Sequence, residues 1–165
     1  MDRALLTLAQ DVGDWLAARG SMLATAESCT GGWIAEAVTA VSGSSAWFDR
    51  GWVTYSNEAK MEMLGVQPHT LQTRGAVSEA VVLEMVMGAL LHSRASHAVA
   101  VSGVAGPTGG TAEKPVGMVC LAWGQRGGGM QVQTHHFDGD REAVRRQTVE
   151  AALRGLMAMD STLTA

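Results

Sequence analysis

The chain lacks the features that would place it in a membrane or send it to the secretory pathway. No apolar run in its 165 residues approaches the ~18 residues that a membrane helix needs, although the mean hydropathy is +0.09. The N-terminal segment MDRALLTLAQDVGDWLAARG has no basic start, no compact apolar stretch and no small-residue cleavage site, which argues against a signal peptide. We therefore expect a cytoplasmic protein that does not bind membranes.

Cysteine and positive charge are also scarce. The two cysteines, Cys29 and Cys120, have neither metal-ligand spacing nor a disulfide framework around them, so we expect reduced thiols. The 12 basic residues against 16 acidic ones give a formal net charge of −4, which argues against nucleic acid as a general partner. The five histidines are scattered, and the neighbours His135 and His136 should face opposite sides of a strand. The sequence predicts no metal, no cofactor and no Ser-His-Asp triad.

Apolar material is plentiful, at 47% of residues, and its spacing predicts an α/β protein. Helices are expected over residues 4–18, 32–40, 56–64, 78–94 and 140–159, with an irregular segment around residue 68. Strands are expected over residues 22–26 and 51–55, from residue 97 onward, and over 117–123 and 130–137. The last two should form a hairpin joined by GQRGGG. This order predicts a three-layer α/β/α sandwich with a mixed, mostly parallel sheet, as one domain over residues 1–165.

The high apolar content of so small a chain bears on its assembly as well. Five tryptophans are present, and aromatic residues are enriched at protein interfaces. We therefore expect a homo-oligomer, with a homodimer as the simplest form.

Three loops that follow predicted strands hold most of the candidate site residues. They read ESCTGG (27–32), TYSNEAK (54–60) and SGVAGPTGG (102–110). Ligands of open α/β sheets bind where strands end, so we expect the loops to meet along one sheet edge. With the start of the last helix, they supply the candidate substrate-binding residues Thr30, Gly31, Gly32, Asn57, Ser102, Gly103, Gly106 and Arg141.

The first loop admits a structural and a chemical interpretation. Its two glycines allow a ligand to approach the backbone and leave helix N–H groups free for an anion. Ser28 and Thr30 either cap the following helix or take part in chemistry. Cys29 is interpreted as a packing residue, because no histidine lies near it in sequence to activate it. Glu27 is either an active-site carboxylate or, as we favour, a hydrogen-bonding residue at the edge of the core.

The second loop places a lysine where a helix should begin. If Asn57 opens that helix, Lys60 lies in its first turn, where a positive charge opposes the helix dipole. Lys60 is then either solvated or buried and deprotonated to act as a base. The ordinary pKa of lysine is about 10.4, and a general base works best near the operating pH.

The third loop and the last helix offer further anion contacts. The third loop lacks the residue order of a P-loop, yet its backbone N–H groups suit a phosphate or an oxyanion; the alternative is a mobile surface loop. Arg141, Arg145 and Arg146 open the last helix and either grip an anion or form a solvated face. Of these, Arg141 is the phosphate candidate on charge grounds.

These motifs together resemble the CinA C-terminal-domain family. The resemblance rests on AESCTGG, YSNEAK, GAVSE and SGVAGPTGG and covers nearly the whole chain, from about residue 5 through the last helix. One departure is Thr108, where relatives often have aspartate or glycine.

The resemblance implies an activity and assigns roles. Stand-alone members of the family are nicotinamide-nucleotide amidases, which hydrolyse NMN to nicotinate mononucleotide and ammonia in pyridine nucleotide salvage. Ser28 would be the nucleophile, and Lys60 and Tyr55 would be its catalytic partners. Two alternatives remain: a non-catalytic CinA-like protein that binds a partner in competence or the DNA-damage response, and an amidase acting on another small amide.

Overall fold

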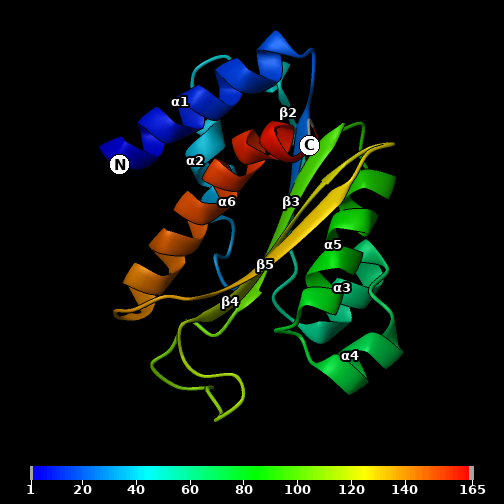
Figure 1. Cartoon of the computed structure of the whole chain (residues 1–165), viewed down its shortest axis with the longest axis vertical. Helices are drawn as coiled ribbons and strands as arrows, with labels where there is room; N and C mark the ends of the chain where they lie inside the picture. The colour runs from blue at the N-terminus through cyan, green and yellow to red at the C-terminus, as the bar shows by residue number, and fades with distance from the viewer. Residues whose placement is uncertain (1, 164–165) are drawn as a thin grey trace.

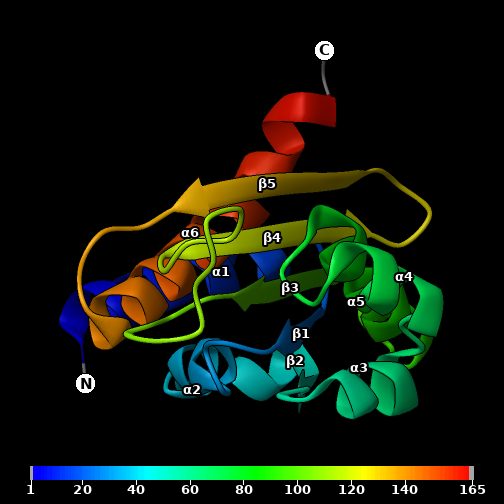
Figure 2. The same ribbon diagram turned by 90° about the horizontal axis from the view of Figure 1, so that it is seen from below.

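The computed structural model describes residues 2–163, with the side chains of residues 2–159. Its middle layer is a five-stranded sheet in the order β2-β1-β3-β4-β5 (Figures 1 and 2). The strands are β1 (Leu23–Glu27), β2 (Phe48–Val53), β3 (His97–Gly103), β4 (Met118–Gln125) and β5 (Met130–His136). β1 pairs in parallel with β2 and β3, whereas β4 is antiparallel to both β3 and β5. Only β4 therefore runs against the other strands, and the predicted hairpin is confirmed.

Helices cover both faces of the sheet, as Figures 1 and 2 show. One face carries α1 (Arg3–Ala18), α2 (Trp33–Thr39) and α6 (Arg141–Leu163). The other face carries α3 (Asn57–Leu64), α4 (Pro68–Arg74) and α5 (Glu79–Leu91). A short 3₁₀ turn, η1 (Ser44–Ala46), precedes β2. The predicted three-layer α/β/α sandwich is confirmed.

The two-residue repeat of β1 divides its side chains between the two cores. Leu23 packs with the residues of α1, α2 and α6, while Ala24 and Ala26 pack with those of α4 and α5. Successive strand residues point to opposite faces. Glu27 therefore faces the α2 layer, and Ser28, which follows it, faces the α3 layer.

Several elements differ from the sequence-based expectation. The second strand begins at Phe48 and ends at Val53, which leaves Thr54 and Tyr55 in the loop beyond it. The segment expected to be irregular is helix α4, with Pro68 in its first turn. A proline fits there because that position needs no N–H donor and its fixed φ suits a helix. The last helix continues to Leu163.

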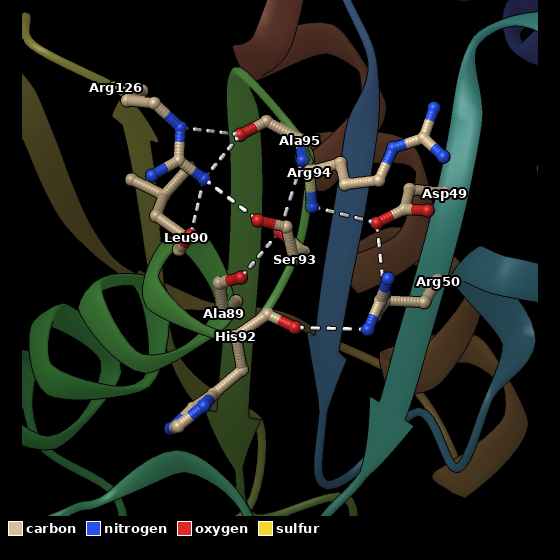
Figure 3. A network of polar contacts seen from close by, with 9 residues as sticks. All are labelled: Asp49, Arg50, Ala89, Leu90, His92, Ser93, Arg94, Ala95 and Arg126. Atoms are coloured by element: carbon tan, nitrogen blue, oxygen red, sulfur yellow. Dashed lines mark hydrogen bonds and ion pairs between the residues drawn. The ribbon is translucent and has the colours of Figure 1, made fainter.

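The strand ends opposite Ser28 are tied to the end of α5 (Figure 3). The last carbonyl groups of a helix have no partner inside it. The Arg126 guanidinium donates to three carbonyl oxygens there, those of Leu90, Ser93 and Ala95. Next to them, the Asp49 carboxylate accepts from Arg50 Nε at 2.9 Å and from the backbone N–H of Arg94 at 3.0 Å. This network fixes the start of β2 and β3 and lies away from the predicted loops.

Candidate active site

The three loops meet at one edge of the sheet, as predicted. The backbone N–H of Ser28 donates to Val101 O at 3.1 Å, and that of Thr54 donates to Glu27 O at 2.8 Å. The ends of β1, β2 and β3 are thereby held side by side. Helix α3 begins at Asn57, with the Ser56 hydroxyl accepting from the N–H of Ala59 as its N-cap.

Lys60 and Ser28 form the central contact of this edge. Lys60 Nζ lies 3.0 Å from Ser28 Oγ and donates to Thr54 O at 2.8 Å. The lysine is only 1% exposed. Among the side chains that the structure describes, no carboxylate lies within ion-pair distance of Lys60. Lys60 is therefore buried rather than solvated, and its role as a base stays a prediction.

Burial sets the charge of the groups around Ser28. It lowers the pKa of Lys60, because the ammonium form loses its hydration without gaining a carboxylate. Burial raises the pKa of the Cys29 thiol to about 12, and the Glu27 carboxylate nearby adds to this. The thiol is therefore uncharged at neutral pH and gives the lysine no counter-charge. It packs in the core under α1, α2 and α6, so the packing interpretation of Cys29 is the one that the structure favours.

Glu27, rather than Ser28 or Thr30, caps the start of α2. Glu27 Oε1 accepts from Thr30 Oγ1 at 2.5 Å and from the N–H of Ile34 at 2.8 Å, and Oε2 accepts from the N–H of Ala35 at 3.0 Å. The N-cap position is Gly32, which has φ +102° and no side chain to offer. Burial raises the pKa of Glu27, and the donated hydrogen bonds oppose that shift. The favoured hydrogen-bonding role of Glu27 is confirmed.

Tyr55 is held by Arg141 rather than by Lys60. The tyrosine is 62% exposed, and its hydroxyl accepts from Arg141 Nη2 at 2.9 Å. Arg141 Nη1 donates to Gly106 O at 2.7 Å. Figure 1 shows the loop between β3 and β4 beside the first turn of α6, where this contact lies. Arg141 therefore connects the second loop, the third loop and the last helix.

A cavity of about 660 Å³ opens beside the first loop. Its lining residues are Thr30, Gly31, Gly32, Trp33, Glu36, Arg141, Glu142 and Arg145. Arg145 Nε donates to Cys29 O and its Nη2 to Thr30 O, both at 3.1 Å, and the guanidinium lies 5.5 Å from the ring centroid of Trp33. The cavity thus offers two guanidinium groups and two carboxylates within reach of the first loop.

The remaining predicted residues lie at or near the same edge. The buried hydroxyl of Thr30 donates a hydrogen bond to Glu27, so Thr30 lines the cavity with its other atoms. Asn57 is exposed at the start of α3. Ser102 is buried at the end of β3, next to Gly103, where an added Cβ atom would collide with Val119 and Met118.

Sequence reasoning missed two contributors. Arg145 was assigned to a group of three arginines on the last helix, but the structure places it on the carbonyl groups of the first loop, more than 100 residues away in sequence. Arg146 instead pairs with Asp2 and Glu150, away from the cavity lining. Thr54 contributes a backbone carbonyl, which no side-chain pattern reveals.

The fold and these contacts define a three-layer α/β domain with a serine–lysine pair at one edge of its sheet. The chain belongs to the CinA C-terminal domain family, whose model matches residues 5–159. It is 54% identical to "Nicotinamide-nucleotide amidohydrolase PncC" of Escherichia coli K12 over 94% of each chain. It is 56% identical to the protein of that name from Pseudomonas putida, over 94% of this chain and 96% of the relative.

A solved structure shows the same fold. The crystal structure of the competence/damage inducible protein CihA from Agrobacterium tumefaciens superposes with a TM-score of 0.92 at 50% identity, covering 94% of this chain and 95% of that one. Within residues 2–163, no helix is long and apolar enough to cross a membrane. In the same described part of the chain, no group of three or more His, Cys, Asp or Glu side chains is arranged to hold a metal ion. Metal independence stays a prediction.

The depressed pKa of Lys60 predicts a pH-dependent stability. Below about pH 10.4, lysine in the unfolded chain takes up a proton, while buried Lys60 does not until the pH reaches its lowered pKa. The free energy of unfolding should therefore fall with decreasing pH across that window, by up to about 1.4 kcal/mol per pH unit. Lys60→Met removes this titration. Urea unfolding of both proteins between pH 7 and 10.5 measures the difference; equal pH dependence would show that Lys60 titrates as a solvated lysine.

Proposed function

We propose that this chain is a nicotinamide-nucleotide amidohydrolase that converts NMN to nicotinate mononucleotide and ammonia. The observation that carries the proposal is the buried Lys60, whose Nζ lies 3.0 Å from Ser28 Oγ and pairs with no carboxylate of residues 2–159. Relatives that match over 94% of this chain bear the name of this activity. A serine with a neutral lysine as its base is a known nucleophile arrangement.

The pair supplies both halves of an acyl transfer. Ser28 Oγ attacks the amide carbonyl carbon while its proton passes to Lys60 Nζ. The lysine then gives that proton to the amide nitrogen, the C–N bond breaks and ammonia leaves. Water attacks the resulting ester in the same way, which releases nicotinate mononucleotide and restores Ser28. The Thr54 carbonyl orients the amine by accepting one of its hydrogens. We expect Tyr55, whose hydroxyl accepts from Arg141, to relay the proton or orient the ammonia once substrate is bound.

Backbone N–H groups would stabilise the oxyanion of the tetrahedral intermediate. The N–H of Gly31 already donates to Ser28 O at 3.0 Å, so the candidates are Thr30, Gly32 and the Ser102–Gly103 pair. Such a donor is worth roughly 2.7–4 kcal/mol in other enzymes.

The cavity beside the first loop suits the rest of NMN. Arg141 and Arg145 present positive charge toward a phosphate. Glu36 and Glu142 line the same cavity and can receive the ribose hydroxyls or face the pyridinium cation. NMN carries a negative phosphate and a positive pyridinium ring, so a cavity lined by both arginines and glutamates fits it. We expect Asn57, at the exposed start of α3, to contact the nicotinamide amide.

The pathway, the location and the oligomeric state are also part of the proposal. A role in pyridine nucleotide salvage, a cytoplasmic location and a homodimer are predictions, as is the use of NMN rather than another small amide. A partner-binding protein without turnover would gain nothing from burying a lysine against Ser28.

The nucleophile is tested by paired substitutions. Ser28→Ala should lower kcat for NMN at least ~1,000-fold, because the attacking oxygen is gone. Cys29→Ala should keep kcat within a few-fold, since the thiol is protonated and buried. Ammonia release from NMN by the purified variants, with folding checked by circular dichroism, gives the answer. Activity that survives Ser28→Ala and disappears in Cys29→Ala would move the nucleophile to the cysteine.

Substitutions of Lys60 test whether it is the base. Lys60→Arg should be nearly as damaging as Lys60→Ala, because a guanidinium stays protonated and cannot accept the serine proton. In the wild type, kcat/KM should rise with pH through an apparent pKa well below about 10.4, the ordinary value for lysine. Lys114→Arg, at the only other lysine of the chain, is the matched control and should leave the profile unchanged. Near wild-type kcat/KM in Lys60→Arg would contradict the mechanism.

A further inference from the structure

The turn that carries Ser28 is held from beneath by a single carboxylate. Glu27 is 1% exposed and accepts hydrogen bonds from the Thr30 hydroxyl and from the N–H groups of Ile34 and Ala35. It therefore joins the last residue of β1 to the middle of the turn and to the first turn of α2. Any shift of the helix relative to the strand would break several of these bonds.

Glu27 and Ser28 are neighbours whose side chains point to opposite faces of the sheet. Glu27 reaches into the α2 layer, while Ser28 Oγ reaches Lys60 on α3. The backbone between them is fixed on both sides, by Thr54 N–H on Glu27 O and by Ser28 N–H on Val101 O. The direction of the Ser28 side chain thus depends on how the chain leaves residue 27 and enters the turn.

Capping alone does not require this arrangement. A serine or aspartate at the N-cap position would satisfy the same helix N–H groups locally. Here Gly32 occupies that position, and the cap comes from Glu27, five residues earlier (32 − 27 = 5). A local cap would leave the turn free to move relative to the strand, whereas this one ties the nucleophile's neighbour to the helix.

We infer that Glu27 is a positioning residue, which acts through the Ser28–Gly32 turn to hold Ser28 Oγ at hydrogen-bond distance from Lys60 Nζ. Its kinetic consequence for NMN rests on the proposed function; its effect on the nucleophilicity of Ser28 does not. Glutamine at this position has one acceptor oxygen in place of two and turns an NH₂ group toward helix N–H groups. The turn then relaxes, and the Ser28–Lys60 contact lengthens.

The first readout is turnover of NMN. A misplacement of about 1 Å can cost ~100-fold in rate, so Glu27→Gln should lower kcat by about that factor with a much smaller change in KM. The fall should appear at temperatures where thermal unfolding shows the variant fully folded. Glu27→Asp, which keeps the charge but shortens the reach, should lie between Glu27→Gln and the wild type.

The second readout is independent of NMN. Phenylmethylsulfonyl fluoride reports on an activated serine: Ser28 Oγ bonds to sulfur, the S–F bond breaks, fluoride leaves and Lys60 takes the serine proton. Intact-protein mass spectrometry follows the modification, and Ser28→Ala identifies the modified residue. We expect sulfonylation of Glu27→Gln to be at least tenfold slower than that of the wild type.

The control is a carboxylate of similar chemistry at the other end of the sheet. Asp49 also accepts a backbone N–H, that of Arg94, and lies in the network of Figure 3. Asp49→Asn should lower the thermal midpoint without changing kcat or the sulfonylation rate. Thr30→Val removes one donor to Glu27 while preserving shape, and should slow both reactions less than Glu27→Gln. It serves as the test if Glu27→Gln does not fold.

The outcomes of these experiments distinguish the proposed NMN hydrolysis from the positioning role of Glu27. If Glu27→Gln and Thr30→Val lose thermal stability but react with wild-type rates, Glu27 is only a helix cap and the inference is overturned. If the wild type does not hydrolyse NMN but its sulfonylation still depends on Glu27, the proposed substrate fails and the positioning role stands. If the wild type hydrolyses NMN and both readouts fall together in Glu27→Gln, both ideas are supported.

Discussion

The site depends on one constraint: Lys60 is removed from water, and no carboxylate among the described side chains pairs with it. Its Nζ is satisfied by a hydroxyl and a carbonyl, those of Ser28 and Thr54, and neither carries charge. Desolvation disfavours the ammonium form, so this environment favours an amine that can accept a proton. The energetic cost of that burial falls on the stability of the fold, which is a common feature of functional sites.

The surrounding architecture holds Ser28 and Lys60 close to each other. Parallel pairing of β1 with β2 and β3 brings Ser28, Thr54 and the end of β3 to one edge. Side chains then hold the first loop and the start of α2. Glu27 accepts from two backbone N–H groups at the start of α2, and Arg145 of α6 donates to two carbonyl groups of the loop. The network at the opposite end fixes where the same strands begin, so little freedom remains for the nucleophile.

Much of this could be predicted from the sequence, because periodicity and loop composition are local signals. The layers, the hairpin and the meeting of the three loops all followed from such signals, whereas the roles of Ser28 and Lys60 came from the resemblance to the CinA C-terminal-domain family. The helix at Pro68 was missed because proline reads as a breaker unless its position within the helix is known. Arg145 was missed because its partners lie more than 100 residues away, and the capping role of Glu27 over Thr30 depends on side-chain geometry that no spacing rule contains.

The charge of Lys60 can be measured directly, because the chain has only two lysines. Protein grown with lysine labelled by ¹³C at Cε gives two resonances, and Lys114→Arg leaves the one that belongs to Lys60. We expect this resonance to titrate well below about pH 10.4, the ordinary lysine value, and Ser28→Ala, which removes its hydroxyl partner, to shift the midpoint. A Lys60 resonance that titrates at the ordinary lysine value, unchanged by Ser28→Ala, would show that Lys60 is not held as a neutral amine.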